Sequence, residues 1–139
     1  MIMGNFIDLM KGFEDCFTGK GAKDDAIAQA EHELSLKFAD DYKKYLRECG
    51  VASADGHEFT GLIESKRLNV VDATLAWREK QSSVPEDLYV VENLQMDGIV
   101  ILQAADGKVY KTILDEAPKH ICDSLYEYFK TSTDYEDLL

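Results

Sequence analysis

Apolar residues recur at helical spacing through the first third of the chain. One run covers residues 6–17, with charged positions between the apolar ones, and we expect it to end at Gly19 and Gly21. The same spacing predicts a second helix over about residues 24–36. A third helix is predicted over residues 40–49, followed by a glycine suited to end it. Aromatic residues on these stripes indicate a core rather than a ligand site.

The period changes in the middle of the chain. Residues 58–63 predict a short strand in which Gly61 indicates a bulge or a close approach of another backbone segment. Helical spacing returns over residues 70–77 and ends in the polar run 78–83.

Three strands in succession are predicted next. Residues 88–92 are rich in β-formers, and residues 98–103 contain four consecutive apolar side chains suited to a central strand. Asp106-Gly107 indicates a hairpin that returns through residues 109–113. A closing helix is predicted to begin near Pro118.

The order of these elements predicts an α+β fold, with a mixed, antiparallel-rich central sheet and helices packed around it. The length of 139 residues suits a single domain over 1–139. Within it, residues 1–22 form an N-terminal helix and loop, and the acidic tail 131–139 is expected to fray.

The chain is strongly acidic, with 15 Lys and Arg residues against 27 Asp and Glu residues and a net charge of −12. Such a field repels nucleic acid and anionic lipid, and it attracts a basic protein. Solubility alone is an equally good explanation of the charge. We therefore expect no direct binding to nucleic acid or membrane.

The three cysteines, Cys16, Cys49 and Cys122, contain no CxxC pair, which favours free thiols in a reducing compartment. Nothing in the first residues resembles a secretory signal, and no apolar run approaches the roughly 20 residues that span a bilayer. We expect a cytoplasmic protein.

Reactive groups are sparse in the sequence. His57 and Glu58, in a predicted loop after Asp55-Gly56, form the one local acid–base cluster, and no second catalytic group is placed beside them. The acids of the tail lack the spacing of a calcium loop. We predict no catalytic residue, no cofactor and no metal site. A hydrolase or metal-dependent enzyme built on His57 and Glu58 stays as a third hypothesis.

The segment from the second to the third predicted helix has a familiar order. A helix carrying Glu31 leads through Leu36-Lys37-Phe38-Ala39-Asp40-Asp41-Tyr42 into a helix that precedes Gly50. Segments 59–62, 69–78, 84–93, 97–110 and 121–129 follow in matching order. Together they resemble the SUKH superfamily (the Smi/Knr family) over about residues 24–130. Ala39 stands where that family usually has proline, a difference that removes a rigid helix start and is expected to change no chemistry.

The resemblance implies a protein-binding role. Bacterial members of this family are mostly immunity proteins that bind and block a cognate toxin domain, often a nuclease, and fungal members are regulatory scaffolds. The family carries no catalytic residues and no agreed metal site. The leading hypothesis is therefore a bacterial immunity protein, and the alternative is a regulatory or scaffolding module that binds a cellular protein unrelated to toxins.

Candidate partner-binding residues follow from loop position alone. They are polar or acidic groups near the predicted strand ends: Asp55, His57, Glu58, Glu92 and Asp97. The expected partner is a toxin with a basic surface, held by aromatic anchors and steered by charge. Whether the chain is a monomer or a homodimer stays open.

Overall fold

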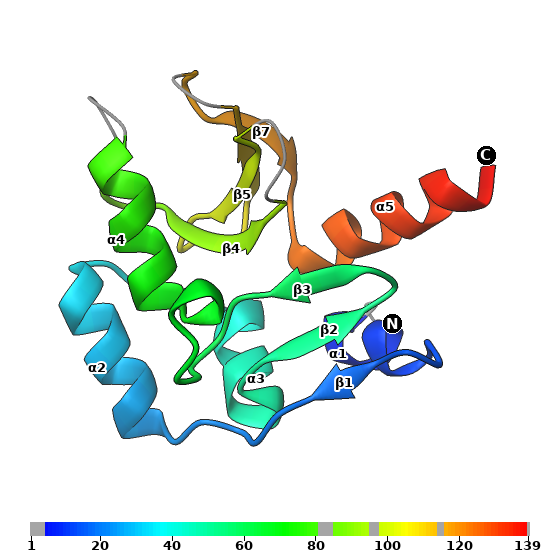
Figure 1. The fold of residues 1–139 in the computed structure, drawn as a ribbon, viewed down its shortest axis with the longest axis horizontal. Coiled ribbons are helices and arrows are strands. Elements are labelled where there is room, and N and C mark those ends of the chain that lie inside the picture. The colour runs from blue at the N-terminus through cyan, green and yellow to red at the C-terminus, as the bar shows by residue number, and fades with distance from the viewer. Residues whose placement is uncertain (1–4, 81–84, 95–97, 114–115, 139) are drawn as a thin grey trace.

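A seven-stranded antiparallel sheet, with its strands in chain order, organises the structure (Figure 1). The computed structural model describes residues 5–80, 85–94, 98–113 and 116–138. The strands are β1 (Phe17–Thr18), β2 (Ala52–Ala54), β3 (His57–Phe59), β4 (Tyr89–Asn93), β5 (Val100–Gln103), β6 (Val109–Thr112) and β7 (Lys119–Cys122). Each strand pairs with the next in antiparallel register.

Helices surround this sheet, which confirms the α+β fold. They are α1 (Phe6–Lys11), α2 (Asp24–Leu34), α3 (Asp40–Cys49), α4 (Val70–Lys80) and α5 (Leu125–Leu138), with the short 3₁₀-helix η1 (Lys66–Leu68) before α4. In Figure 1, α2 and α4 stand side by side at one end of the molecule, while α5 extends toward the other. α4 packs against β4, and α1 packs against α3 and α5.

Strand β4 is buried on both faces, because helices cover both. Tyr89 and Val91 belong to the main aromatic core, whereas Val90 belongs to a smaller core with Trp77 and Leu102. Alternate side chains of a strand point to opposite faces, so one strand serves both cores. This explains the near-continuous apolar run in its sequence.

The N-terminal prediction is wrong beyond Lys11. Helix α1 is capped by the Asn5 side chain, ends at Lys11, and gives way to β1. Phe17, predicted on the helix stripe, pairs with Ser53 and is 61% exposed. Gly21 does not end a helix; a Cβ there would lie 1.9 Å from the Arg47 carbonyl oxygen, so the glycine permits close backbone packing.

The second correction concerns residues 52–59. They form the β2–β3 hairpin, and the turn residues Asp55 and Gly56 have φ values of 50° and 81°. Positive φ at both central positions is the requirement of a tight two-residue hairpin, which Asp-Gly meets well. His57 therefore lies on a strand, not in the loop predicted for it.

The third correction is at the C-terminal end. Pro118 does not begin a helix, because Lys119–Cys122 pairs with β6 as the edge strand β7 and α5 begins at Leu125. The meander therefore has four strands, not three. Helix α5 includes the tail positions up to Leu138, and whether they fray stays a prediction.

Several predictions are confirmed. Helix α3 covers the predicted residues 40–49, and Gly50, with a φ of 73°, follows it. The Asp106-Gly107 hairpin joins β5 to β6. Gly61 is a point of close backbone approach, since a Cβ there would lie 1.9 Å from the Gly50 carbonyl oxygen.

Candidate functional site

The carboxylate of Glu92 lies buried at the junction of β3, β4 and α5. The residue is 2% exposed, and the Tyr128 hydroxyl donates a 2.6 Å hydrogen bond to its Oε1. Nδ1 of His57 lies 3.0 Å from both carboxylate oxygens. A buried carboxylate is costly unless it is paired and hydrogen-bonded, and these two partners supply that pairing.

Aromatic rings hold His57 in this position. Its imidazole stacks on Phe59, with ring centroids 5.6 Å apart and planes 10° apart. Phe129 and Tyr128 meet the imidazole edge-on at 5.3 and 5.9 Å. The packing orients Nδ1 toward Glu92, so the His57–Glu92–Tyr128 group ties the hairpin and α5 to the centre of the sheet.

Glu58 lies apart from this buried group. The Arg67 guanidinium donates hydrogen bonds of 2.9 and 3.4 Å to its two carboxylate oxygens, at an exposed position. The Arg67 hydrogen bond holds the pKa of Glu58 below its ordinary value. The hypothesised His57–Glu58 acid–base pair is thus not assembled: each residue binds a different partner.

The remaining sequence candidates are placed as follows. Asp55 is half-buried in the β2–β3 turn, and its amide donates a 2.9 Å hydrogen bond to the Asp15 carboxylate. Asp97 lies outside the described residues. The structure brings His57 and Glu58 on β3 close to Glu92 on β4, because Phe59 pairs with Glu92 across the two strands, and Asp55 lies in the adjoining β2–β3 turn.

A shallow polar hollow lies over this region. It has a volume of about 370 Å³ and is lined by Gly56, Glu58, Arg67, Glu92, Asn93 and Leu94. Two acidic residues and the Arg67 guanidinium therefore surround one hollow. A partner's polar or cationic side chain fits this chemistry.

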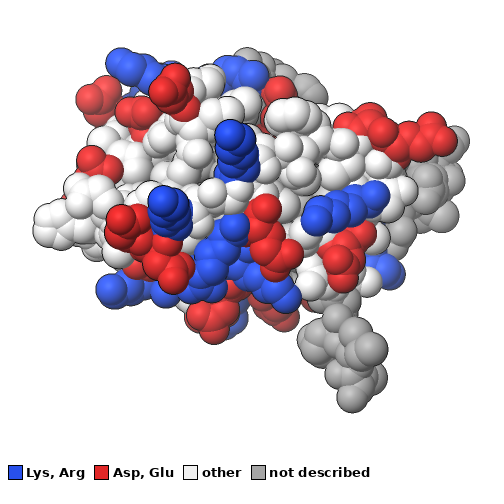
Figure 2. All heavy atoms as spheres, turned by 90° about the horizontal axis from the view of Figure 1, so that it is seen from below, with Lys and Arg blue, Asp and Glu red and all other residues white. Residues whose placement is uncertain are grey.

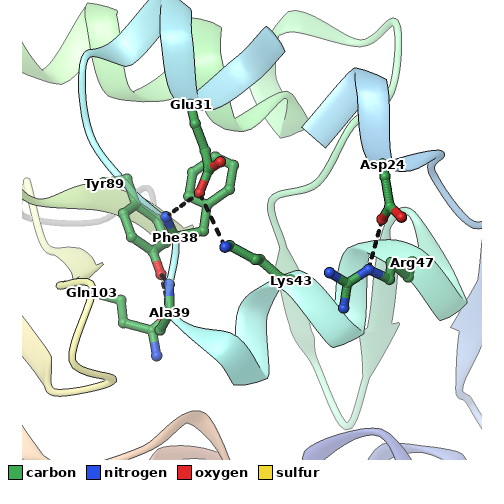
Figure 3. A network of polar contacts seen from close by, with 8 residues as sticks. All are labelled: Asp24, Glu31, Phe38, Ala39, Lys43, Arg47, Tyr89 and Gln103. Atoms are coloured by element: carbon green, nitrogen blue, oxygen red, sulfur yellow. Dashed lines mark hydrogen bonds and ion pairs between the residues drawn. The ribbon is translucent and has the colours of Figure 1, made fainter. Parts of the chain in front are cut away.

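Sequence reasoning missed a second polar network, at the turn between α2 and α3 (Figure 3). The Glu31 carboxylate accepts a 2.8 Å hydrogen bond from the Phe38 amide and lies 3.6 Å from Lys43 Nζ. The Ala39 amide donates to the Tyr89 hydroxyl at 2.9 Å, and that hydroxyl donates to Gln103 Oε1 at 2.6 Å. Ala39 thus supplies a donor that proline lacks, contrary to the expectation that its difference from the family changes no chemistry.

The network continues to the C-terminal helix. Gln103 Nε2 donates to Asp41 Oδ1 at 2.9 Å, and Asp41 Oδ2 accepts from the Leu125 amide at 3.0 Å. A polar residue inside an apolar strand, Gln103, was the available signal in the sequence. The contacts join α3, β4, β5 and the start of α5, so the network has a structural role.

The three cysteines differ in burial, since Cys49 and Cys122 are buried and Cys16 is half-buried. All three are free, and desolvation raises the pKa of each thiol.

Among the residues that the structure describes, no three His, Cys, Asp or Glu side chains gather as a metal-binding group. No helix in the described ranges has the length and apolar character to cross a membrane.

Charge on the surface is mixed rather than uniformly acidic on at least one face. Figure 2 shows Lys and Arg side chains interspersed with Asp and Glu side chains on that face. Exposed charges also pair with one another, as in the 2.8 Å contact between Arg47 on α3 and Asp24 on α2 (Figure 3). The net charge of −12 therefore does not describe every surface of the molecule.

The comparison with protein families gives a match over almost the whole chain. The family model SUKH_5, described as SMI1-KNR4 cell-wall, matches residues 3–134. The chain belongs to the SMI1-KNR4 family. SUKH proteins are generally non-catalytic and are often immunity proteins, and the observed antiparallel sheet with surrounding helices is the α+β architecture predicted from the order of the elements. No curated protein matches the chain significantly.

Proposed function

We propose that this SMI1-KNR4 protein is a non-catalytic immunity protein that binds a cognate toxin domain in the bacterial cytoplasm and blocks it. The observation that carries the proposal is the family match over residues 3–134. The net charge of −12 adds a reason for a basic partner, because opposite charges speed encounter and suppress wrong pairings. A nuclease, which needs a basic surface to hold nucleic acid, suits this chemistry.

The β2–β3 hairpin and the polar hollow beside it are the proposed contact region. Asp55 and Glu58 offer carboxylates there, with Asp97 as a further sequence candidate, and Arg67 is already held by Glu58. His57 and Glu92 support this region from the interior of the protein, because the contact between them holds β3 against β4. Glu92, at 2% exposure, supports the contact rather than making it.

Co-expression tests the function. The toxin encoded beside this gene is expected to be lethal alone and harmless with the protein present. Protection that fails against every neighbouring toxin contradicts immunity. The association rate is expected to fall steeply between low and high salt, and a rate that salt does not change contradicts the electrostatic part.

Variants test the contact region. Asp55→Asn with Glu58→Gln is expected to slow association, whereas Asp25→Asn, an exposed acid on α2, is the matched control. If both changes have the same effect on the association rate, the hairpin is not the contact region. Glu58→Gln alone removes one of the two proposed contact carboxylates and is expected to slow association less than the double variant.

A regulatory module that binds a cellular protein is the second candidate. The description of the matching family model, SMI1-KNR4 cell-wall, favours it. Gene neighbourhood separates the two candidates, since an immunity gene lies beside its toxin gene and a regulator need not.

A further inference from the structure

One large apolar side chain beside the β2–β3 hairpin is open to solvent, that of Phe17 on β1. Its exposed fraction, 61%, is the highest among the large hydrophobic residues that the structure describes. β1 is the first strand of the sheet and pairs with β2 alone among the described strands, so Phe17 lies on an open edge (Figure 1). An exposed apolar side chain on an edge strand is a position at which another chain can associate.

The strand register places Phe17 on the outer face of the hairpin. Phe17 pairs with Ser53, and Ser53 pairs with Glu58, so the three side chains form a row across β1, β2 and β3. The next row points to the opposite face, where Ala52 and Phe59 belong to the main core. Phe17 belongs to neither core. It is therefore an aromatic residue in a row whose other members are polar.

Hydrogen bonds hold the backbone on both sides of Phe17. On the C-terminal side, the Gly19 amide donates a 2.8 Å hydrogen bond to the Val51 carbonyl oxygen. On the N-terminal side, the Asp15 carboxylate accepts a 2.9 Å hydrogen bond from the Asp55 amide. A contact residue whose backbone is already positioned loses little conformational freedom when a partner binds.

Two carboxylates lie beside this aromatic residue. The hydrogen bond from the Asp55 amide brings Asp55 and Asp15 together, and Asp15 precedes Phe17 by two residues. Neither carboxylate forms an ion pair with a residue that the structure describes. Because like charges repel at short range, a cation from a partner would be stabilised here. The edge therefore suits a surface that combines an apolar pocket with Lys or Arg residues.

We propose that Phe17 is the aromatic anchor of the toxin interface. Its ring enters an apolar pocket of the toxin, and Lys or Arg residues at the margin of that pocket contact Asp15 and Asp55. This role rests on the proposed function, and it extends the contact region from the hairpin to the edge strand β1. Aromatic anchors in a desolvated pocket supply most of the affinity of an interface, whereas charges mainly set the association rate. The ring and the two acids are therefore expected to have separate kinetic effects.

The kinetics of toxin binding test this role, with the toxin domain encoded beside the gene as the probe and the full-length protein immobilised. Phe17→Thr, which keeps a residue of high β-propensity in the strand, is expected to raise the dissociation rate at least about tenfold and to leave the association rate nearly unchanged. Asp15→Asn with Asp55→Asn should do the reverse and slow association at low salt. The matched control is Ile121→Thr on the opposite edge strand β7, 38% exposed, which is expected to have no effect.

A variant that keeps the ring and a cross-linking experiment separate lost binding from lost folding. Phe17→Tyr is expected to hold the dissociation rate within about threefold of the wild type, because the ring is retained. With p-benzoyl-phenylalanine in place of Phe17, ultraviolet light should cross-link the protein to the toxin, and the same replacement of Ile121 should not. Thermal denaturation should show little change for these variants, since both positions are exposed.

The outcomes distinguish this role from the proposed function. If the wild type binds and neutralises the toxin, an unchanged dissociation rate for Phe17→Thr or a missing cross-link from position 17 overturns the anchor role and leaves the proposed function standing. If the wild type neither binds nor neutralises the toxin, the proposed function fails and the anchor role fails with it.

Discussion

The amide of Ala39 donates a 2.9 Å hydrogen bond to the hydroxyl of Tyr89, 50 residues later in the chain. Ala39 precedes α3 with a φ of −68°, a value that proline also adopts. The backbone angle alone would thus accept the residue usual in the family. Proline at this position would lose the hydrogen bond, because proline has no amide hydrogen.

Ala39→Pro is expected to destabilise the protein by roughly 1 kcal/mol, because proline lacks the donor and its ring occupies the place of the amide hydrogen. The free energy of unfolding from urea denaturation measures this. In a Tyr89→Phe background the same change should cost less, since the acceptor is already gone. Equal costs in the two backgrounds would show that the hydrogen bond contributes nothing.

His57→Ala is expected to lower the free energy of unfolding by about 3 kcal/mol, because it leaves the Glu92 carboxylate buried with one partner removed. His120→Ala is the matched control: His120 bonds Asp123 at an exposed position and should cost less than about 0.5 kcal/mol. Similar losses for both variants would contradict the role assigned to burial.

Glu92→Gln is expected to cost less than His57→Ala, because the side-chain amide keeps an acceptor for the Tyr128 hydroxyl. Urea denaturation of both variants checks the order. His57→Ala is consequently a poor test of catalysis, since lost activity would also follow from lost stability. Glu58→Gln largely avoids this loss of stability, because the Glu58 side chain is about half exposed.

The Glu58–Arg67 ion pair predicts a small pH dependence of stability. The pKa of Glu58 is lowered in the folded state, so the pair stabilises the protein above the unfolded-state pKa and loses this contribution as pH falls through the folded-state pKa. Both side chains are about half exposed, which limits the contribution to between about 0 and 1 kcal/mol. The stability difference between the wild type and Glu58→Gln should vanish at low pH and shrink in high salt. A difference that is constant with pH would refute the assignment.

Gly61→Ala is expected to destabilise the fold severely, because its Cβ would overlap the Gly50 carbonyl oxygen at 1.9 Å and neither backbone can move independently. Gly12→Ala is the matched control, since its Cβ would meet the nearest backbone oxygen at an ordinary 3.4 Å and Gly12 is in the right-handed helical region. Thermal denaturation should show a loss for the first variant and little change for the second.

Local signals predicted the elements that local forces build. Helix α3 was predicted to the residue because its apolar stripe and following glycine act within one segment. The Asp106-Gly107 hairpin followed from the turn chemistry of two residues. The equivalent signal at Asp55-Gly56 was present and overlooked, because the short β2 strand beside it, Ala52–Ala54, has little β-propensity.

Other features were decided by tertiary contacts. Phe17 continues a helical spacing, yet pairing with Ser53 places it on an edge strand. Lys119–Cys122 forms a strand because it pairs with the edge of β6. The local sequence pattern does not predict that pairing. Glu92 was predicted as a surface contact, and its burial follows from the positions of His57 and Tyr128, each more than 30 residues away.

By itself, the sequence determined the α+β class, the acidic charge and the family resemblance, because composition and element order are properties of the chain read along its length. The partners of each polar group were decided only in three dimensions. Hydrogen bonds and ion pairs act over a few ångströms, and the fold alone determines which distant residues come within that range.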